Sequence, residues 1–154
     1  MSIIFPPSND LIYAYYLDTT GELTFKHWND KTPEFVYDSA MPYFSILVPT
    51  IDTVRYSFII EWLLCMNKLV YVTGGSGTGK SVIVQSLLSE IQDSRGIDPI
   101  YLIFSAQTTS FVTQLTIEGK LEKIKKALLG AKPGRSSCIF IDDVNMPALE
   151  EYGS

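Results

Sequence analysis

Apolar residues along the chain fall into short continuous runs and into longer segments with helical spacing. The short runs Leu69–Val72, Ile100–Phe104 and Cys138–Ile141 are rich in β-forming residues, so they predict buried strands. Between them, Lys80–Gln92 and Ser110–Leu129 place apolar residues every three or four positions and predict helices. Strands that alternate with helices predict an α/β fold with a mainly parallel sheet.

The first part of the chain has a different pattern. Residues 1–47 are rich in aromatic side chains, which we interpret as packing residues. The runs Ile12–Leu17 and Glu22–His27 flank a turn sequence and predict a β-hairpin-like segment, followed by a loop at residues 29–33. A further helix is predicted over Thr53–Asn67, with Asp52 as its N-cap. We therefore divide the chain into an N-terminal β segment, 1–47, and a core, 48–154.

Composition sets limits on the class of protein. The 154 residues suffice for one domain with a core, and the net charge is −5. Without a long apolar run or a basic start, the sequence predicts neither a membrane span nor a secretory signal, which indicates the cytoplasm or the cytoskeleton. Cys65 and Cys138 lie in apolar runs and are expected to be reduced and buried. His27 alone cannot form a zinc site, so we expect it to be a structural or a surface residue.

A cluster of basic residues lies late in the chain. Half of the 12 lysines and arginines fall between Lys120 and Arg135. A nucleic-acid patch is one interpretation, and a solvated helix face is the other. Glu118 and Glu122 interrupt the cluster, and no aromatic residues accompany it for base stacking, which favours the solvated face. We expect no nucleic-acid partner.

The strongest chemical signal is the pattern G-x-x-x-x-G-K-S after the first predicted strand and before a predicted helix. Glycines let backbone N–H groups approach a phosphate, and the helix N-terminus favours the same anion. Lys80 would contact the β- and γ-phosphates, and the Ser81 hydroxyl would bind Mg²⁺. The pattern predicts an ATP or ADP site with Mg²⁺, formed by Gly74, Gly75, Ser76, Gly77, Thr78, Gly79, Lys80 and Ser81.

Two acids follow the third predicted strand. Asp142 is placed to hold Mg²⁺, directly or through water. Asp143 is placed to orient or activate a water for attack on the γ-phosphate, so we assign it, with Lys80, as a candidate catalytic residue.

Taken together, these motifs resemble an AAA+ ATPase module, a P-loop NTPase with a three-layer α/β/α fold. Longer runs resemble the third AAA+ module of dynein heavy chains, axonemal more than cytoplasmic. They are residues 48–56 (VPTIDTVRY), 104–109 (FSAQTT), 120–123 (KLEK), 141–147 (IDDVNMP) and 151–153 (EYG). The resemblance covers about residues 10–154.

The resemblance implies further roles. Val48, Pro49 and Thr50 would line the adenine pocket, Gly74–Ser81 would be the Walker A loop, and Asp142 with Asp143 the Walker B acids. The module would regulate a microtubule motor of the cilium or flagellum axoneme. Its partners would be neighbouring AAA+ modules and, through the full motor, light and intermediate chains and microtubules.

The sequence departs from the family pattern at Asp143, where AAA+ modules usually carry glutamate. Aspartate is one methylene shorter, so slow or absent hydrolysis with intact binding is expected. The chain also stops after the third core strand, before the family's sensor strand, arginine finger and lid, so we interpret it as an incomplete module. In the family's strand order Leu69–Val72 would then lack both of its neighbours. A vestigial structural module and a small P-loop kinase or NTPase remain alternatives.

Overall fold

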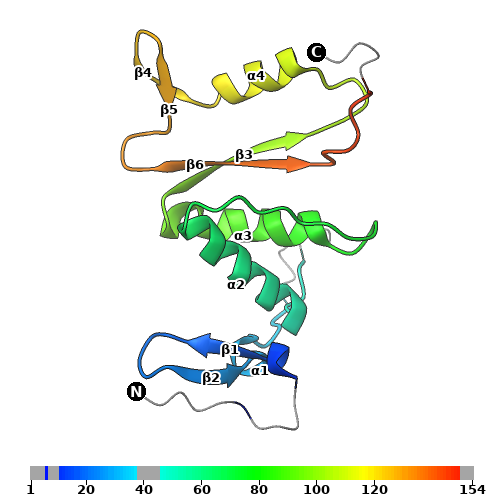
Figure 1. Cartoon of the computed structure of the whole chain (residues 1–154), viewed down its shortest axis with the longest axis vertical. Helices are drawn as coiled ribbons and strands as arrows, with labels where there is room; N and C mark the ends of the chain where they lie inside the picture. Colours follow the sequence, from blue (N-terminus) through cyan, green and yellow to red (C-terminus); the bar gives the residue numbers. More distant parts are fainter. Residues whose placement is uncertain (1–5, 7–10, 38–45, 150–154) are drawn as a thin grey trace. The chain divides into compact units, whose positions relative to one another are not determined.

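The computed structural model describes residue 6, residues 11–37 and residues 46–149. It divides into two compact units, Met1–Ile83 and Val84–Ser154, each described by itself below. Secondary structure alternates between short strands and helices (Figure 1), which confirms an α/β fold. The predicted domain boundary between residues 47 and 48 stays a prediction.

The first unit begins with the predicted hairpin. Strands β1 (Tyr15–Asp18) and β2 (Thr24–His27) pair antiparallel, with Tyr15 opposite His27. Ile12–Ala14 forms a 3-10 turn instead of the start of a strand. The Asp18 carboxylate accepts hydrogen bonds from the backbone and hydroxyl of Thr20 and pairs with Lys26 across the hairpin. The turn therefore carries its own polar network.

The loop predicted at residues 29–33 is wrong in part, because α1 (Trp28–Lys31) occupies most of it. His27 caps this helix: its Nδ1 accepts from the Asn29 N–H at 3.1 Å, so its role is structural, as predicted. Trp28 is only 4% exposed and packs against Tyr16 and Phe58. These contacts confirm a packing role for Tyr16 and Trp28, whereas Tyr13, Phe35 and Tyr37 are exposed.

Helix α2 (Ile51–Cys65) begins and ends with specific backbone caps. Thr50, not the predicted Asp52, is the N-cap: its hydroxyl accepts from the Thr53 N–H, and the Thr53 hydroxyl accepts from the Thr50 N–H. At the other end Asn67 adopts a left-handed conformation with φ 54°. The Asn67 and Lys68 N–H groups then donate back to the carbonyls of residues 64 and 63, which terminates the helix.

The strand predicted at Leu69–Val72 does not form. These residues pair with no strand among the described part of the chain, and Leu69 is fully exposed. The backbone N–H and C=O groups of an extended segment form sheet hydrogen bonds only with a neighbouring strand. An apolar run without such a neighbour therefore does not form a strand.

The second unit is built on a parallel strand pair. Strands β3 (Ile97–Ile103) and β6 (Ser136–Asp142) pair in parallel with Ile100 opposite Ile139, which confirms the second and third predicted strands with extended ends. Helix α3 (Lys80–Ser94) is confirmed with two more residues at its end. The buried core consists of Val84, Leu87, Leu88, Ile91, Ile97, Ile100 and Leu102.

The long helix predicted over Ser110–Leu129 is wrong beyond its first half. Helix α4 (Ser110–Glu118) ends at Gly119, and an antiparallel hairpin of β4 (Glu122–Lys125) and β5 (Leu128–Gly130) follows. Glycine is a poor helix former, so the four-residue spacing of apolar residues did not outweigh the stop at Gly119. The basic residues therefore lie on and around a hairpin, not on a helix face.

The environments of the two cysteines differ from the prediction. Both are free thiols, but Cys65 is exposed at the end of α2 and Cys138 is half-buried in β6. Burial raises the pKa of the Cys138 thiol. In the described part of the chain, every helix is too short or too polar to cross a membrane.

Candidate functional site

The glycine-rich loop lies in the first unit and leads directly into α3. Gly77 and Gly79 have φ of 74° and 81°, a left-handed region that side chains disfavour, so glycine at both positions is a backbone requirement. A Cβ at either residue would meet nothing within 4 Å, so the constraint is conformational and not steric. The Gly79 carbonyl accepts from the Ile83 N–H at 3.0 Å and starts the helix.

Lys80 is tied to the loop by its ammonium group. Its Nζ donates to the carbonyl oxygens of Gly74 at 3.1 Å and Gly75 at 2.5 Å, and lies 3.3 Å from Thr78 Oγ1. Thr78 Oγ1 in turn donates to the Gly75 carbonyl at 3.0 Å. The structure thus brings three of the predicted loop residues, Gly74, Gly75 and Thr78, around the Lys80 ammonium. A bound phosphate can replace the glycine carbonyls as acceptor for the Lys80 ammonium group, because an anionic phosphate oxygen is a stronger acceptor than a neutral carbonyl.

The other predicted residues of the first unit are placed as follows. Ser81 lies in the first turn of α3, one residue after Lys80, where a hydroxyl can serve a cation bound to phosphates. Ser76 belongs to the exposed tip of the loop. Val48 is half exposed, Pro49 is half-buried, and the Thr50 hydroxyl is used as the helix cap. Their predicted adenine contacts stay a prediction.

The two acids lie in the second unit, at the carboxyl end of β6. Asp142 is the last residue of the strand, and its carbonyl accepts from the Phe104 N–H at 3.1 Å, which extends the pairing with β3. Asp143 is exposed with φ 52°, and its N–H donates to Asp142 Oδ1 at 3.1 Å. Among non-glycine residues, aspartate and asparagine tolerate this left-handed conformation best. The backbone at this position therefore suits aspartate better than glutamate.

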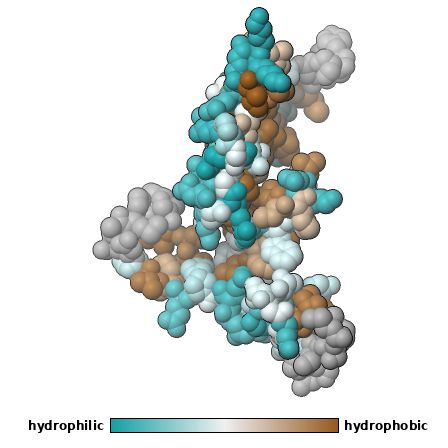
Figure 2. Space-filling model, turned by 90° about the vertical axis from the view of Figure 1, so that its left-hand side faces the viewer, coloured by the Kyte–Doolittle hydropathy of each residue, from teal (hydrophilic) through white to brown (hydrophobic). Residues whose placement is uncertain are grey.

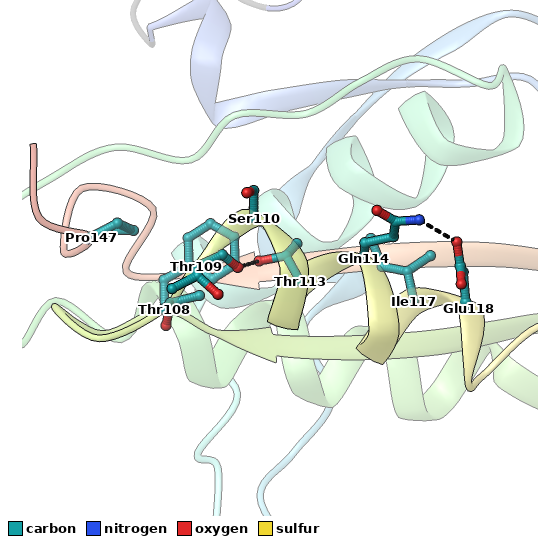
Figure 3. Close-up of a pocket in the computed structure, with 9 residues that line it drawn as sticks. Thr108, Thr109, Ser110, Thr113, Gln114, Ile117, Glu118 and Pro147 are labelled. Carbon is teal, nitrogen blue, oxygen red and sulfur yellow. Dashed lines mark hydrogen bonds between the residues drawn. The ribbon is translucent and has the colours of Figure 1, made fainter. Parts of the chain in front are cut away.

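Sequence reasoning missed a pocket of about 640 Å³ in the second unit, beside α4 (Figure 3). The hydroxyl of Thr109 caps α4 and that of Thr113 donates to the Thr109 carbonyl, while Gln114 donates to Glu118 at 2.7 Å. These polar groups therefore already take part in hydrogen bonds within α4 and its N-cap. The lining consists of Phe104, Thr108, Thr109, Ser110, Thr113, Gln114, Ile117, Glu118 and Pro147. Helical spacing in this segment predicted only a helix and gave no signal for a pocket.

Comparison with known proteins gives the family. Residues 35–154, which include the loop and both acids, match the family described as "P-loop containing dynein motor region". The chain belongs to the dynein motor P-loop family. Relatives include human dynein axonemal heavy chain 6, which is 50% identical over 127 residues and 82% of this chain. Mouse heavy chain 5 is 37% identical over 148 residues, and rat heavy chain 12 is 36% identical over 146.

The matched region is a small part of these relatives. The chain spans 3% of the length of human heavy chain 6 and mouse heavy chain 5, and 5% of rat heavy chain 12, while 94–95% of this chain is covered in the latter two. Membership of a P-loop motor family implies a nucleotide site in general, and the loop at Gly74–Ser81 is the part of this chain with the geometry for it.

Proposed function

We propose that this chain binds Mg-ATP and Mg-ADP at Gly74–Ser81 and acts as a regulatory AAA+ site of an axonemal-type dynein heavy chain, in the position of the third module. The observation that carries the proposal is the loop in which Lys80 Nζ lies within hydrogen-bonding distance of two glycine carbonyls at the start of α3. A loop of this pattern binds phosphate through backbone N–H groups and a helix N-terminus, and Lys80 supplies a cation beside them.

The cation would be held by residues of two kinds. The Ser81 hydroxyl and the Asp142 carboxylate are hard oxygen ligands of the type that Mg²⁺ prefers. Bound Mg²⁺ would neutralise charge on the phosphates. Lys80 would orient the same phosphates, and Val48, Pro49 and Thr50 would contact the adenine. The partners we propose are neighbouring AAA+ modules and, through the whole motor, light and intermediate chains and microtubules of the axoneme.

Binding with slow turnover fits the second acid. The Asp143 carboxylate is one methylene shorter than the usual glutamate, and its left-handed backbone favours aspartate. A general base that does not reach the attacking water contributes little to the rate. We therefore propose that this site regulates the motor through whether nucleotide is bound, more than through the rate of ATP hydrolysis.

Calorimetry with Mg-ATP and Mg-ADP tests the binding step. Lys80→Ala should weaken binding by about tenfold to a hundredfold, because it removes hydrogen bonds to a charged group. Lys68→Ala, which removes an exposed lysine of the same unit, is the matched control and should leave binding unchanged. If the folded wild type bound neither nucleotide, the site would be vestigial and the chain a structural spacer.

Turnover is tested by Asp143→Glu. We expect nucleotide affinity to change by less than about threefold and hydrolysis to rise by about tenfold or more, because the longer carboxylate reaches the water. Asp143→Asn is the control that keeps the backbone preference and removes the base. Equal hydrolysis by wild type and the glutamate variant would show that aspartate already acts as the base, and would remove the argument for slow turnover.

A further inference from the structure

The hairpin β4–β5 differs in charge from the rest of the chain. Residues 120–132, which we name the basic hairpin, hold five lysines and one glutamate and so carry a net charge of +4. Subtracting this from the chain's −5 leaves −9 for all other residues. The five lysines have no carboxylate within 4.0 Å among the described residues. Their charge is therefore available to something outside the described chain.

Apolar side chains lie among these lysines. Ile124, Leu128 and Leu129 are 56%, 51% and 40% exposed. Within the second unit, β4 and β5 pair only with each other and stand off the β3–β6 pair (Figure 1). In the space-filling view, apolar and hydrophilic surface lie side by side at this end of the unit (Figure 2). A two-stranded hairpin with both faces in water is marginally stable, so a partner that covers it would also stabilise it.

The cross-strand register shows what kind of surface fits. Lys123 lies opposite Leu129, and Lys125 lies opposite Leu128, with an irregularity between the two pairs. Residues directly opposite each other project from the same face, so each pair places a lysine beside a leucine. Because neither pair is purely apolar, the hairpin is not built to lie on a lipid surface with one face.

Nucleic acid fits this hairpin less well than protein does. Residues 120–132 include no aromatic side chain for base stacking, and a phosphate backbone gives three aliphatic side chains nothing to pack against. A protein groove can offer both kinds of contact, with apolar side chains at the centre of the interface and carboxylates at its polar rim.

We propose that the basic hairpin is a docking element that inserts into an acidic groove of a protein partner, with Leu128, Leu129 and Ile124 in apolar contact with the groove and the lysines against carboxylates at its rim. Charge complementarity sets the partner's chemistry and would raise the association rate. This inference does not rest on the nucleotide site.

Site-specific photocrosslinking in the native assembly tests the proposal. Benzoylphenylalanine in place of Leu128 is compared with the same label in place of Leu115, a residue of α4 with the same 51% exposure. We expect at least a fivefold higher yield from the Leu128 position, attached to a protein segment of net negative charge. Lys123→Glu with Lys125→Glu should reduce that yield severalfold, and acid-to-lysine changes in the captured segment should restore it.

Two controls keep the outcome clear. Amide exchange in β3 and β6 should be the same in all variants, which shows that the unit remains folded. Capture of an acidic segment of another protein, with yield restored by the charge-swapped pair, would support the proposal, and capture of a second copy of this chain would overturn it. Attachment to RNA or lipid, attachment to a segment without net negative charge, or a yield equal to the Leu115 control would overturn it.

Discussion

The two units hold their structure by different means. Among the described residues, the first unit buries only Trp28 and Ile60 of its large apolar side chains, whereas the second buries seven, all from α3 and β3. The first unit relies on local devices, such as the capping box of Thr50 and Thr53 and the turn network of Asp18. Helix-on-sheet burial is cumulative, while each cap or turn contributes only about 1 kcal/mol. The phosphate loop therefore lies in the unit with less burial.

The same contrast appears in two leucines from similar apolar runs. Leu102 in β3 is 6% exposed, and Leu69 is fully exposed. Both runs predict buried strands, but only the one at Leu102 has a paired neighbour in the described structure, β6. An apolar, β-prone run gives a strand only when another segment supplies the ladder and the covering layer.

The largest expected effect is a difference in stability between a core substitution in the second unit and an exposed substitution in the first. Leu88→Ala, at a side chain only 1% exposed, should lower the free energy of unfolding by about 2–5 kcal/mol, because it removes buried area and leaves a cavity. Leu69→Ala, the matched control, should change it by less than about 0.5 kcal/mol. Denaturant dependence of amide exchange measures each variant in its own unit, in β3 and β6 for Leu88→Ala and in α2 for Leu69→Ala. A loss above about 2 kcal/mol in the control would mean that Leu69 is buried and paired in solution.

Sequence patterns identified those elements whose stability is local or whose partners follow closely. The hairpin at β1–β2, helix α3 and the strands β3 and β6 were predicted correctly. The prediction of one helix over Ser110–Leu129 was wrong because the chain leaves the helix at Gly119 and continues as an irregular hairpin. The apolar residues of this hairpin happen to recur every three or four positions, although its backbone is not helical. The spacing of apolar residues shows which positions are apolar. It does not show where backbone hydrogen bonding changes from the helical pattern to strand pairing.

The candidate site shows the same limit. The glycines and the lysine of the phosphate loop follow from the motif, because the motif encodes backbone conformation. Nothing in the sequence indicated that Lys80 would donate to the carbonyls of Gly74 and Gly75, or that Asp143 would adopt a left-handed conformation. These features depend on backbone geometry at single residues, and the second one bears on the chemistry that we propose.

Thiol reactivity gives a second, smaller test, with one cysteine in each unit. Cys65 is exposed, whereas Cys138 is half-buried in β6 with a pKa raised by burial. We expect Cys65 to react with a neutral disulfide reagent at pH 8 at least about tenfold faster, because attack requires an accessible thiolate. Cys65→Ser and Cys138→Ser assign the two phases. Equal rates would indicate that the β3–β6 pair opens as readily as the end of α2.

The smallest effect is a pH dependence confined to the first unit. Hydrogen bonds from Lys26 and Thr20 hold the pKa of Asp18 far below its ordinary 3.8, and the partner raises that of Lys26. Because the folded pKa is depressed, the pair stabilises the hairpin above about pH 4, and this contribution is lost as the pH falls below 3.8 toward the folded value. Lys26 is about half exposed to solvent, so the contribution is small and salt-sensitive.

An NMR titration of the Asp18 side-chain carboxyl carbon measures this. The resonance should show no midpoint near pH 3.8, and Lys26→Met should move the midpoint up toward that value, because the hydrogen bond from Lys26 is the largest single cause of the lowered pKa. Amide exchange in β3 and β6 is the internal reference: it should not follow the titration of Asp18, which belongs to the other unit. An Asp18 midpoint near 3.8 in the wild type would mean that the pair is open in solution. The Asp18–Lys26 pair would then not be one of the local contacts that stabilise the first unit.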